Sequence, residues 1–296
     1  MTPLDPNSAA IVNFINTGYG TSGGFSDVDV SNDASQDTAS NWDHPVYWAH
    51  PGDPSYVIHE TVYPGNNNGQ TILIPNGARH ALASDAQLAV VQPDGTEHDF
   101  WGVQNANPIS GGGTLTAKSG ANGGSIGGMG CCGNSTAGNQ DLASGLIRGQ
   151  ELQNGVINHA LVVTFRCDNG THVYPATGNG AACSNTTDAP AEGQRFQLRM
   201  TDAEVNALGV PAYRKTILKA MIHYGFFLME TGGSPWDIEF EPGLDYLAFG
   251  YANPLVTYAL SAGIPGSGGV YTLSFNGGVD WSRLQVVAVC VTRRTC

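Results

Sequence analysis

The chain has 296 residues, 41% hydrophobic and only 12% charged, so it is long enough to bury one large all-β core or two ordinary ones. Its 12 Lys and Arg against 25 Asp and Glu give a formal net charge of −13, which leaves no basic face for nucleic acid or an anionic membrane. Residues 1–147 carry 2 basic and 13 acidic residues, so this half accounts for −11 of the total.

The first 60 residues are expected to form N-terminal strands or an extension of the main fold. The next strand signals are residues 70–74, 87–92 and 96–101, each bounded by turn residues. Pro93-Asp94-Gly95 separates the last two, and its Asp-Gly supplies the positive φ that a tight turn requires. These two segments are therefore predicted to form a hairpin.

Residues 107–145 are dominated by Gly, Ser, Asn and Thr. Such a segment buries too little apolar area to offset the entropy of ordering it, so we expect a long inserted loop. Its adjacent Cys131 and Cys132 either close a strained ring or pair with separate partners. The loop either covers a substrate or is an insertion without a function.

A short helical turn is predicted at residues 146–152, followed by strands at 158–165 and 171–174. Cys167 and Cys183 flank turn residues, a pattern that suits two strands joined by a hairpin and linked by a disulfide.

Helix is predicted in one region only. Thr201-Asp-Ala-Glu204 has the form of a capping box, which opens a helix ending near Gly209. Pro211 suits the first turn of a second helix that runs to about Tyr224. Both helices are expected outside the sheets, and the flanking strand signals are residues 195–200, 225–229, 270–275 and 284–291.

Many short strands separated by Gly, Pro, Asn and Asp predict an all-β fold, an antiparallel sandwich or barrel. We expect a single β-sandwich domain over residues 1–296, with 1–60 as its N-terminal strands or extension and 107–145 as its inserted loop.

The even number of cysteines in a Gly-rich chain indicates disulfides, and therefore secretion. Cys290 and Cys296 would close a short terminal loop. There is no Cys-x-x-Cys pattern, so neither a metal nor another cofactor is expected. No signal peptide or apolar run of about 18 residues is present, so the start at Met1 is expected to belong to a mature or recombinant form. The oligomeric state is left open.

Asp99 is the clearest candidate for chemistry, because acids are scarce in this chain and an acid within a strand usually has a partner or a role. Strand alternation puts Glu97, Asp99 and Trp101 on one face of residues 96–101 and Phe100 on the other. Two acids and an indole in a row suit a sugar-binding cleft. The alternative is a solvent-facing edge, with Phe100 in the core.

Three further residues are candidates. His159 lies on an apolar strand face, where it is either a core residue or a catalytic base. Glu151 could cap a helix end, pair with Arg148 or reach the same cleft. Glu230 closes an apolar strand, where burial would raise its pKa, as a general acid requires.

Short motifs between residues 70 and 240 carry a resemblance to a known group of proteins. They are Ser84-Asp85, Glu97-His-Asp-Phe-Trp101, Gly149-Gln-Glu-Leu, Gly155-Val-Ile-Asn-His-Ala-Leu161, Val173-Tyr-Pro-Ala176, Glu192-Gly-Gln-Arg-Phe-Gln-Leu198, Ile217-Leu-Lys-Ala, Tyr224-Gly225 and Glu230-Thr-Gly-Gly233.

With these motifs the chain resembles a group of secreted bacterial proteins common in actinobacteria. The resemblance implies a β-jelly-roll, concanavalin-like sandwich, but no particular activity. The group often has His where this chain has Gln87, so no proton relay is expected there. The matching motifs place five candidates: Asp85, Asp99, Glu151, His159 and Glu230.

We therefore predict a secreted glycan-active enzyme, a glycoside hydrolase that cleaves a polysaccharide with paired carboxylates. The acidic half of the chain would repel polyanions, which favours a neutral polysaccharide. Four carboxyl groups are candidates for the catalytic pair: Asp85, Asp99, Glu151 and Glu230. One of them would act as the general acid and another as the general base or nucleophile. The expected substrate-binding residues are Trp101, Trp236, Tyr174 and Arg148.

Three alternatives stay open. One is a polysaccharide lyase, with His159 as base and Tyr174 or Tyr224 as acid. Another is an acid peptidase of the glutamic type, which would suit the acidic composition. The third is a lectin or surface structural protein without catalytic activity.

Overall fold

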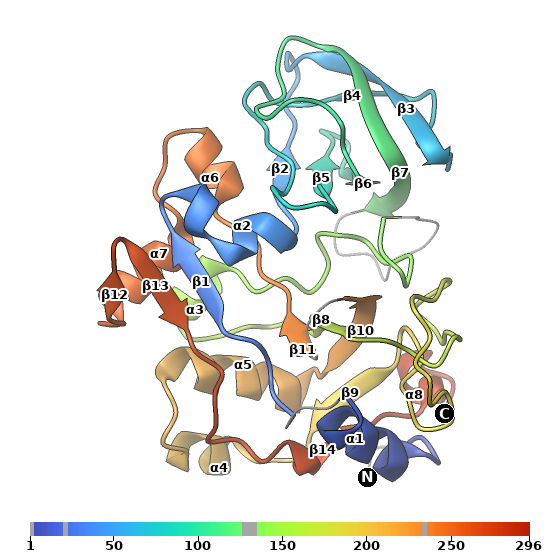
Figure 1. The fold of residues 1–296 in the computed structure, drawn as a ribbon, viewed down its shortest axis with the longest axis vertical. Coiled ribbons are helices and arrows are strands. Elements are labelled where there is room, and N and C mark those ends of the chain that lie inside the picture. The colour runs from blue at the N-terminus through green and yellow to red at the C-terminus, as the bar shows by residue number, and fades with distance from the viewer. Residues whose placement is uncertain (1–2, 20–22, 126–134, 233–235) are drawn as a thin grey trace. The chain divides into compact units, whose positions relative to one another are not determined.

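The computed structural model describes residues 3–19, 23–125, 135–232 and 236–296. The chain forms two compact units. The first comprises Met1–Asp27, Glu151–Glu239 and Ser274–Cys296, and the second comprises Val28–Gln150 and Phe240–Leu273. Three sheets form the frame of the molecule, one in the first unit and two in the second (Figure 1), which confirms the prediction of a sheet-rich fold.

The second unit contains a mixed six-stranded sheet of order β2-β5-β6-β7-β3-β4. Its strands are β2 (Val46–Trp48), β3 (Ser55–Tyr63), β4 (Thr71–Leu73), β5 (Leu88–Val91), β6 (Thr96–Trp101) and β7 (Gly113–Ser125). An antiparallel three-stranded sheet joins β1 (Val28–Ser31), β13 (Val270–Leu273) and β12 (Gly266–Ser267). The helices of this unit are η1 (Ala34–Gln36), α2 (Thr38–Trp42), α6 (Leu244–Ala248) and α7 (Pro254–Ser261).

The predicted hairpin of β5 and β6 is confirmed. The two strands pair antiparallel from Leu88 opposite Phe100 to Val91 opposite Glu97, and Gly95 in the turn has a φ of 88°. Phe100 belongs to a buried apolar cluster. Glu97 and Asp99 lie on the other face of β6, as strand alternation predicts.

The expectation of a long loop over 107–145 is wrong, because β7 occupies thirteen of these residues. β7 pairs with β6 on one side and β3 on the other, so its backbone hydrogen bonds hold it in place despite few apolar side chains. A Cβ at Gly120 would lie 2.7 Å from the carbonyl oxygen of Asp99. Glycine here permits close approach of strands. Cys131 and Cys132 lie outside the described residues.

The first unit contains a mixed five-stranded sheet of order β11-β8-β10-β9-β14. Its strands are β8 (Leu161–Phe165), β9 (Arg195–Leu198), β10 (Phe226–Thr231), β11 (Trp236–Ile238) and β14 (Leu284–Val286). Its helices are α1 (Ser8–Thr17), α4 (Asp202–Ala207), α5 (Ala212–His223), η2 (Trp281–Arg283) and α8 (Val289–Thr292). The chain passes from the second unit to the first within α3 (Gly149–Asn154).

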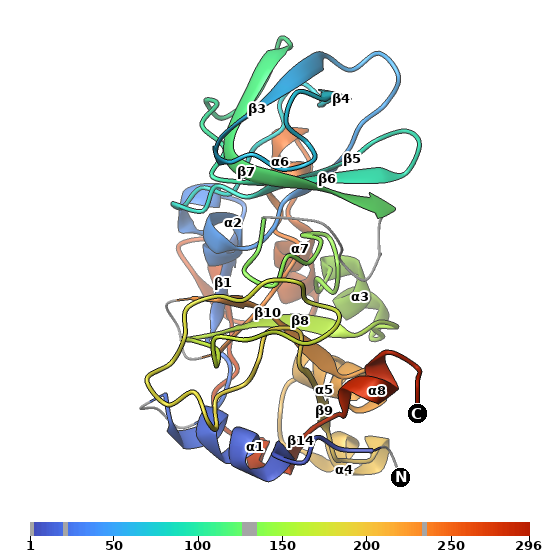
Figure 2. The ribbon, with the colours of Figure 1, turned by 90° about the vertical axis from the view of Figure 1, so that its right-hand side faces the viewer.

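The predicted capping box is present: Thr201 and Glu204 cap each other's backbone N–H groups at the start of α4. α5 also forms where expected. The prediction that helices occur only in this region is wrong, however. Among the described residues, α1 is the longest helix that was not predicted. Asn, Ile, Val and Thr make α1 a weak helix by propensity. It lies alongside β14 (Figure 2) and is stabilised by burying an apolar face against the sheet. That face consists of Ile11, Val12, Phe14 and Ile15.

Both disulfides that were predicted between described cysteines are confirmed, Cys167–Cys183 and Cys290–Cys296. The predicted hairpin between Cys167 and Cys183 is wrong, since residues 171–174 form only an isolated bridge at His172. The last predicted strand ends at Val286, and α8 follows it. Within the described ranges, no helix combines the length and the apolar character needed to cross a membrane.

Candidate functional site

The parallel strands β8 and β10 end at the same edge of the five-stranded sheet. Their register sets Leu161 opposite Phe226 and Thr164 opposite Glu230. Phe165 lies opposite Thr231, so Arg166 follows directly where both strands end, two residues beyond the position opposite Glu230. Ligands of sheets with parallel strands commonly bind beyond the carboxyl ends of those strands.

Glu192 is brought to this edge by the segment before β9. Gly193, its neighbour, donates a backbone hydrogen bond to the carbonyl of Leu228 over 2.9 Å. The Glu192 side chain is fully buried, and neither carboxylate oxygen has a hydrogen-bond partner among the described residues. Burial raises the pKa of Glu192 well above its usual value, and the charges of Glu230 and Asp168 raise it further. Burial and the neighbouring carboxylates therefore favour the protonated, neutral form of Glu192.

Asp168 orders the chain around this acid. Its two carboxylate oxygens accept hydrogen bonds from the backbone N–H groups of Gly170 and Gly180, each over 2.6 Å. The Cys167–Cys183 disulfide closes the same segment. The N–H of Ala181 donates to Thr231 Oγ1 at the end of β10 over 3.0 Å, which ties the segment to the sheet edge.

Tyr19 follows α1 and contacts the same group of residues. Its hydroxyl donates to the carbonyl of Cys167 over 2.9 Å, and Arg166 donates to the carbonyl of Tyr19 over 2.6 Å. Burial raises the pKa of Tyr19, and the nearby charges of Glu192 and Asp168 add to the effect. We call these five residues the carboxyl-edge site: Tyr19, Arg166, Asp168, Glu192 and Glu230.

A pocket of about 540 Å³ opens beside the site, and we call it the edge pocket. Tyr19 and Arg166 belong to its wall together with the Cys167–Cys183 disulfide. Hydrogen-bonding side chains of α1 and of residues 184–188 complete the wall, among them Asn13, Thr17, Asn185 and Asp188. The volume falls within the roughly 300–1,000 Å³ of small-molecule sites.

Two of the predicted residues, Glu151 and His159, form a pair in the first unit. His159 Nε2 lies 2.8 Å from Glu151 Oε1, and its Nδ1 lies 2.9 Å from the carbonyl oxygen of Ala160. Both ring nitrogens face acceptors, an arrangement that suits a charged imidazolium beside a carboxylate. The pair precedes Leu161 at the start of β8, whereas Glu230 lies at the opposite end of these parallel strands.

Asp99 and Glu97 lie in the second unit, both fully buried under residues 141–143. The N–H of Leu142 donates to Asp99 Oδ2 over 3.0 Å, and that of Ala143 donates to Glu97 Oε1 over 2.8 Å. The other oxygen of each acid, Glu97 Oε2 and Asp99 Oδ1, is buried without a hydrogen-bond partner among the described residues, and a proton shared between the two carboxyl groups would satisfy both. Burial raises the pKa of Asp99 well above its usual value, with Glu97 and Asp141 adding to the shift. Neither acid is exposed, so the solvent-facing edge expected for this face of β6 is wrong, although Phe100 lies in the core as that alternative expected.

Asp85 and Trp101 meet at the surface of the second unit. Trp101 Nε1 donates to Asp85 Oδ1 over 3.1 Å. The ammonium of Lys118 lies 4.6 Å from the centre of the Trp101 ring, so one face of this half-exposed indole is occupied.

The role of sugar platform predicted for Trp236 is wrong. Its ring is completely buried among aromatic side chains, and its Nε1 donates to the carbonyl of Ile15 over 2.8 Å. Arg148 forms an ion pair with buried Glu241 over 2.5 Å. Tyr174 is half-buried, with the Arg293 guanidinium 5.5 Å from its ring centre.

Glu192 and Tyr19 were not among the site residues predicted from the sequence. Glu192 carried a usable signal, because it is the one charged residue in the run 189–194. The scarcity of acids that singled out Asp99 applies equally to it. Nothing in the sequence near Tyr19 indicates its contact with Cys167. Among the described residues, no group of three His, Cys, Asp or Glu side chains is suited to a metal ion.

No protein-family model, curated protein or solved structure matches this chain.

Proposed function

We propose that the chain is a glycan-active hydrolase whose reaction takes place at the carboxyl-edge site. One observation carries the proposal: a fully buried glutamic acid without hydrogen-bond partners, Glu192, lies beside the half-buried Glu230 at the edge where two parallel strands end.

Glycoside hydrolysis needs two carboxyl groups in different protonation states, one neutral to protonate the leaving oxygen and one ionised to act as base or nucleophile. Burial favours the protonated form of Glu192, whereas Glu230 is only half-buried and is the more accessible carboxyl group of the two. Tyr19 lines the edge pocket and lies close enough to Glu192 to feel its charge, whereas Glu192 itself does not line the pocket, so direct proton transfer to a sugar there requires a local rearrangement.

The substrate class follows from the edge pocket. Hydroxyl and carboxamide groups line it with one cation, Arg166, and one acid, Asp188. This mixture suits the hydroxyls of a neutral sugar, and the net charge of −13 disfavours polyanionic polymers.

Two finer features belong to the same proposal. The jelly-roll, concanavalin-like type of sandwich and membership of the actinobacterial group are proposed on the motifs of residues 70–240. Secretion is proposed on the composition and the two disulfides.

The test compares Glu192→Gln and Glu230→Gln with the native chain on β-1,3-glucan, β-1,4-xylan and β-1,4-mannan across pH 3–8. Each variant is expected to lose at least about 100-fold in kcat/KM, the usual loss when an acid or base catalyst is removed. The native activity should fall as the pH rises through the raised pKa of Glu192.

Asp202→Asn is the matched control, because Asp202 is an exposed acid of the same unit that pairs with His223. Native turnover by either Gln variant would refute the site. If the native chain instead cleaves casein and Asp99→Asn abolishes that activity, the result would support an acid peptidase that uses the buried carboxyl pair of Asp99 and Glu97.

A further inference from the structure

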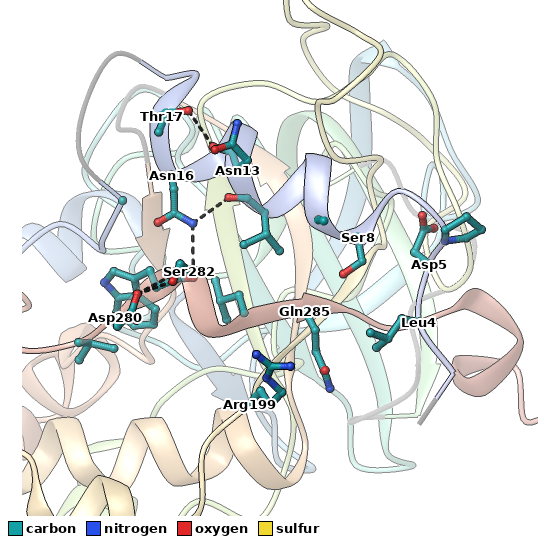
Figure 3. Close-up of a pocket in the computed structure, with 17 residues that line it drawn as sticks. Leu4, Asp5, Ser8, Asn13, Asn16, Thr17, Arg199, Asp280, Ser282 and Gln285 are labelled. Atoms are coloured by element: carbon teal, nitrogen blue, oxygen red, sulfur yellow. Dashed lines mark hydrogen bonds between the residues drawn. The ribbon is translucent and has the colours of Figure 1, made fainter. Parts of the chain in front are cut away.

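The first unit contains a second, wider pocket of about 1200 Å³, which we call the wide pocket. Figure 3 shows its two sides: Asn13, Asn16 and Thr17 of α1 on one side, with Arg199 and Gln285 across from them. No residue selected from the sequence lines it. The wide pocket therefore has no role in the chemistry described so far.

The wide pocket and the edge pocket share two wall residues, Asn13 and Thr17 of α1. These residues are four positions apart, so they lie on one face of the helix, and both are exposed. Val12 and Asn16 line only the wide pocket, whereas Phe14 lines only the edge pocket. Asn13 and Thr17 thus form the boundary between the wide pocket and the edge pocket, and we call this boundary the ridge.

We infer that the two pockets form one binding groove, in which a neutral polysaccharide chain crosses the Asn13–Thr17 ridge and places several sugars in the wide pocket. The ligand class rests on the proposed function. The inference adds that the enzyme takes long chains and holds them well away from the reacting bond.

The wall of the wide pocket favours hydroxyl groups over fixed charges. Its acids already accept local hydrogen bonds: Asp280 from Ser282, over 3.1 Å to the backbone and 2.6 Å to the hydroxyl, and Asp5 from the N–H of Asn7 over 2.8 Å. The Asn13 carboxamide and the Arg199 guanidinium have no hydrogen-bond partner among the described residues. They are therefore available to sugar hydroxyls on both sides of the groove.

A peptide ligand is disfavoured at this groove, because backbone groups of β14, the edge strand that lines it, are already hydrogen-bonded within the chain. A peptide usually binds such an edge by adding a strand to it. The N–H of Val286 already donates to Ser8 Oγ over 2.8 Å, and its carbonyl accepts from the N–H of Asp5 over 2.9 Å. The chain's own N-terminal segment thus occupies backbone groups that a peptide would need.

The test places a bulky side chain on the ridge. Asn13→Trp is compared with Ala207→Trp, a matched control on an exposed position of α4 that lines neither pocket. Both positions are solvent-exposed in helices, so both variants are expected to fold. The probes are β-1,3-glucan, β-1,4-xylan and β-1,4-mannan in affinity gel electrophoresis, then the disaccharide and hexasaccharide of the polymer that retards the native chain.

We expect Asn13→Trp to weaken binding of the hexasaccharide about tenfold more than that of the disaccharide, with Arg199→Ala acting in the same direction. Ala207→Trp should leave both affinities unchanged. An equal effect of Asn13→Trp on both lengths, or no effect, would overturn the inference. Retardation by casein but by no glycan would overturn the ligand class.

The outcome for the groove is separate from that for catalysis. Length-selective binding together with full turnover by Glu230→Gln would sustain the groove and refute the carboxyl-edge site. Turnover that depends on Glu192 and Glu230, together with binding that shows no length selectivity at the ridge, would sustain the carboxyl-edge site and refute the groove.

Discussion

At the scale of single residues, the buried carboxyl pair of Glu97 and Asp99 is the sharpest feature of the second unit. Alternation along β6 predicted that both acids lie on one face. The sequence could not show that residues 141–143, more than forty positions away, cover that face. The backbone N–H groups of Leu142 and Ala143 satisfy one oxygen of each acid, and a proton shared between the two would satisfy the remaining ones, which have no partner among the described residues.

Glu97→Gln tests this arrangement. The new amide keeps an oxygen for the N–H of Ala143 and offers an N–H to Asp99, so the pair no longer requires a proton. The variant should unfold at nearly the native temperature at pH 5 and a few degrees higher at pH 8, where native Asp99 must resist deprotonation. Each unit of pKa shift is worth about 1.4 kcal/mol.

Thermal unfolding at both pH values, followed by circular dichroism, measures the difference. Glu97→Leu is the control, because it leaves the N–H of Ala143 without an acceptor and should be destabilising at both. A Glu97→Gln variant that is no more stable than the native chain at pH 8 would argue against a shared proton.

At the scale of elements, local signals located the strands better than the helices and connections. Asp94-Gly95 and the Thr201–Glu204 box were correctly interpreted, because a turn or a cap is encoded within four residues. β7 and α1 were missed, because packing against distant strands stabilises them while their own residues favour neither element. For the same reason, the sequence could not predict that Glu192 lies near Glu230, because their proximity depends on the pairing of β9 with β10.

The segment closed by Cys167–Cys183 is the element on which the proposed chemistry most depends. Cys167→Ala with Cys183→Ala should cost about 3 kcal/mol of unfolding free energy, the entropy of closing a loop of this length. It should also abolish glycan turnover, because Asp168 and the wall of the edge pocket lose their restraint.

The matched control removes the other disulfide, Cys290–Cys296, which closes a shorter loop and lines neither pocket. It is expected to cost about 2 kcal/mol and to leave turnover intact. Equal activity of the two double variants, measured below both unfolding temperatures, would show that the segment does not shape the site.

At the scale of the whole molecule, many of the acids counted in the sequence are buried. Among the described residues of the second unit, eight acids are buried: Asp37, Asp43, Glu60, Glu97, Asp99, Asp141, Glu241 and Asp245. Only three basic residues belong to that unit: Arg79, Lys118 and Arg148. Most of the acids of the second unit therefore lie inside the fold rather than on its surface.

These burials predict that the protein is most stable in mildly acidic solution. Burial raises the pKa of Asp37 to about 6 and that of Asp245 to about 8, and it also raises the pKa of Glu192. An acid whose pKa is higher in the folded state stabilises the fold below its unfolded pKa, and this stability is lost as the pH rises through the folded value.

Two buried histidines act in the opposite sense. Burial lowers the pKa of His44 and of His98 to about 4, so their contribution is lost as the pH falls from about 6.5 to 4. The raised acids are more numerous, so the unfolding temperature should be highest near about pH 5 and fall steadily to pH 8.5. Calorimetric scans at half-unit intervals measure the profile, and a maximum at or above pH 7.5 would contradict it.

The buried carboxyl groups whose pKa is raised also make unfolding a proton-releasing event. When the chain opens in neutral solution, groups such as Asp99, Glu192 and Asp245 return to ordinary acidity and give their protons to the buffer. The heat absorbed on unfolding therefore includes the ionisation enthalpy of whatever buffer is present. Enthalpies measured in phosphate and in Tris describe the same fold only after that contribution is subtracted.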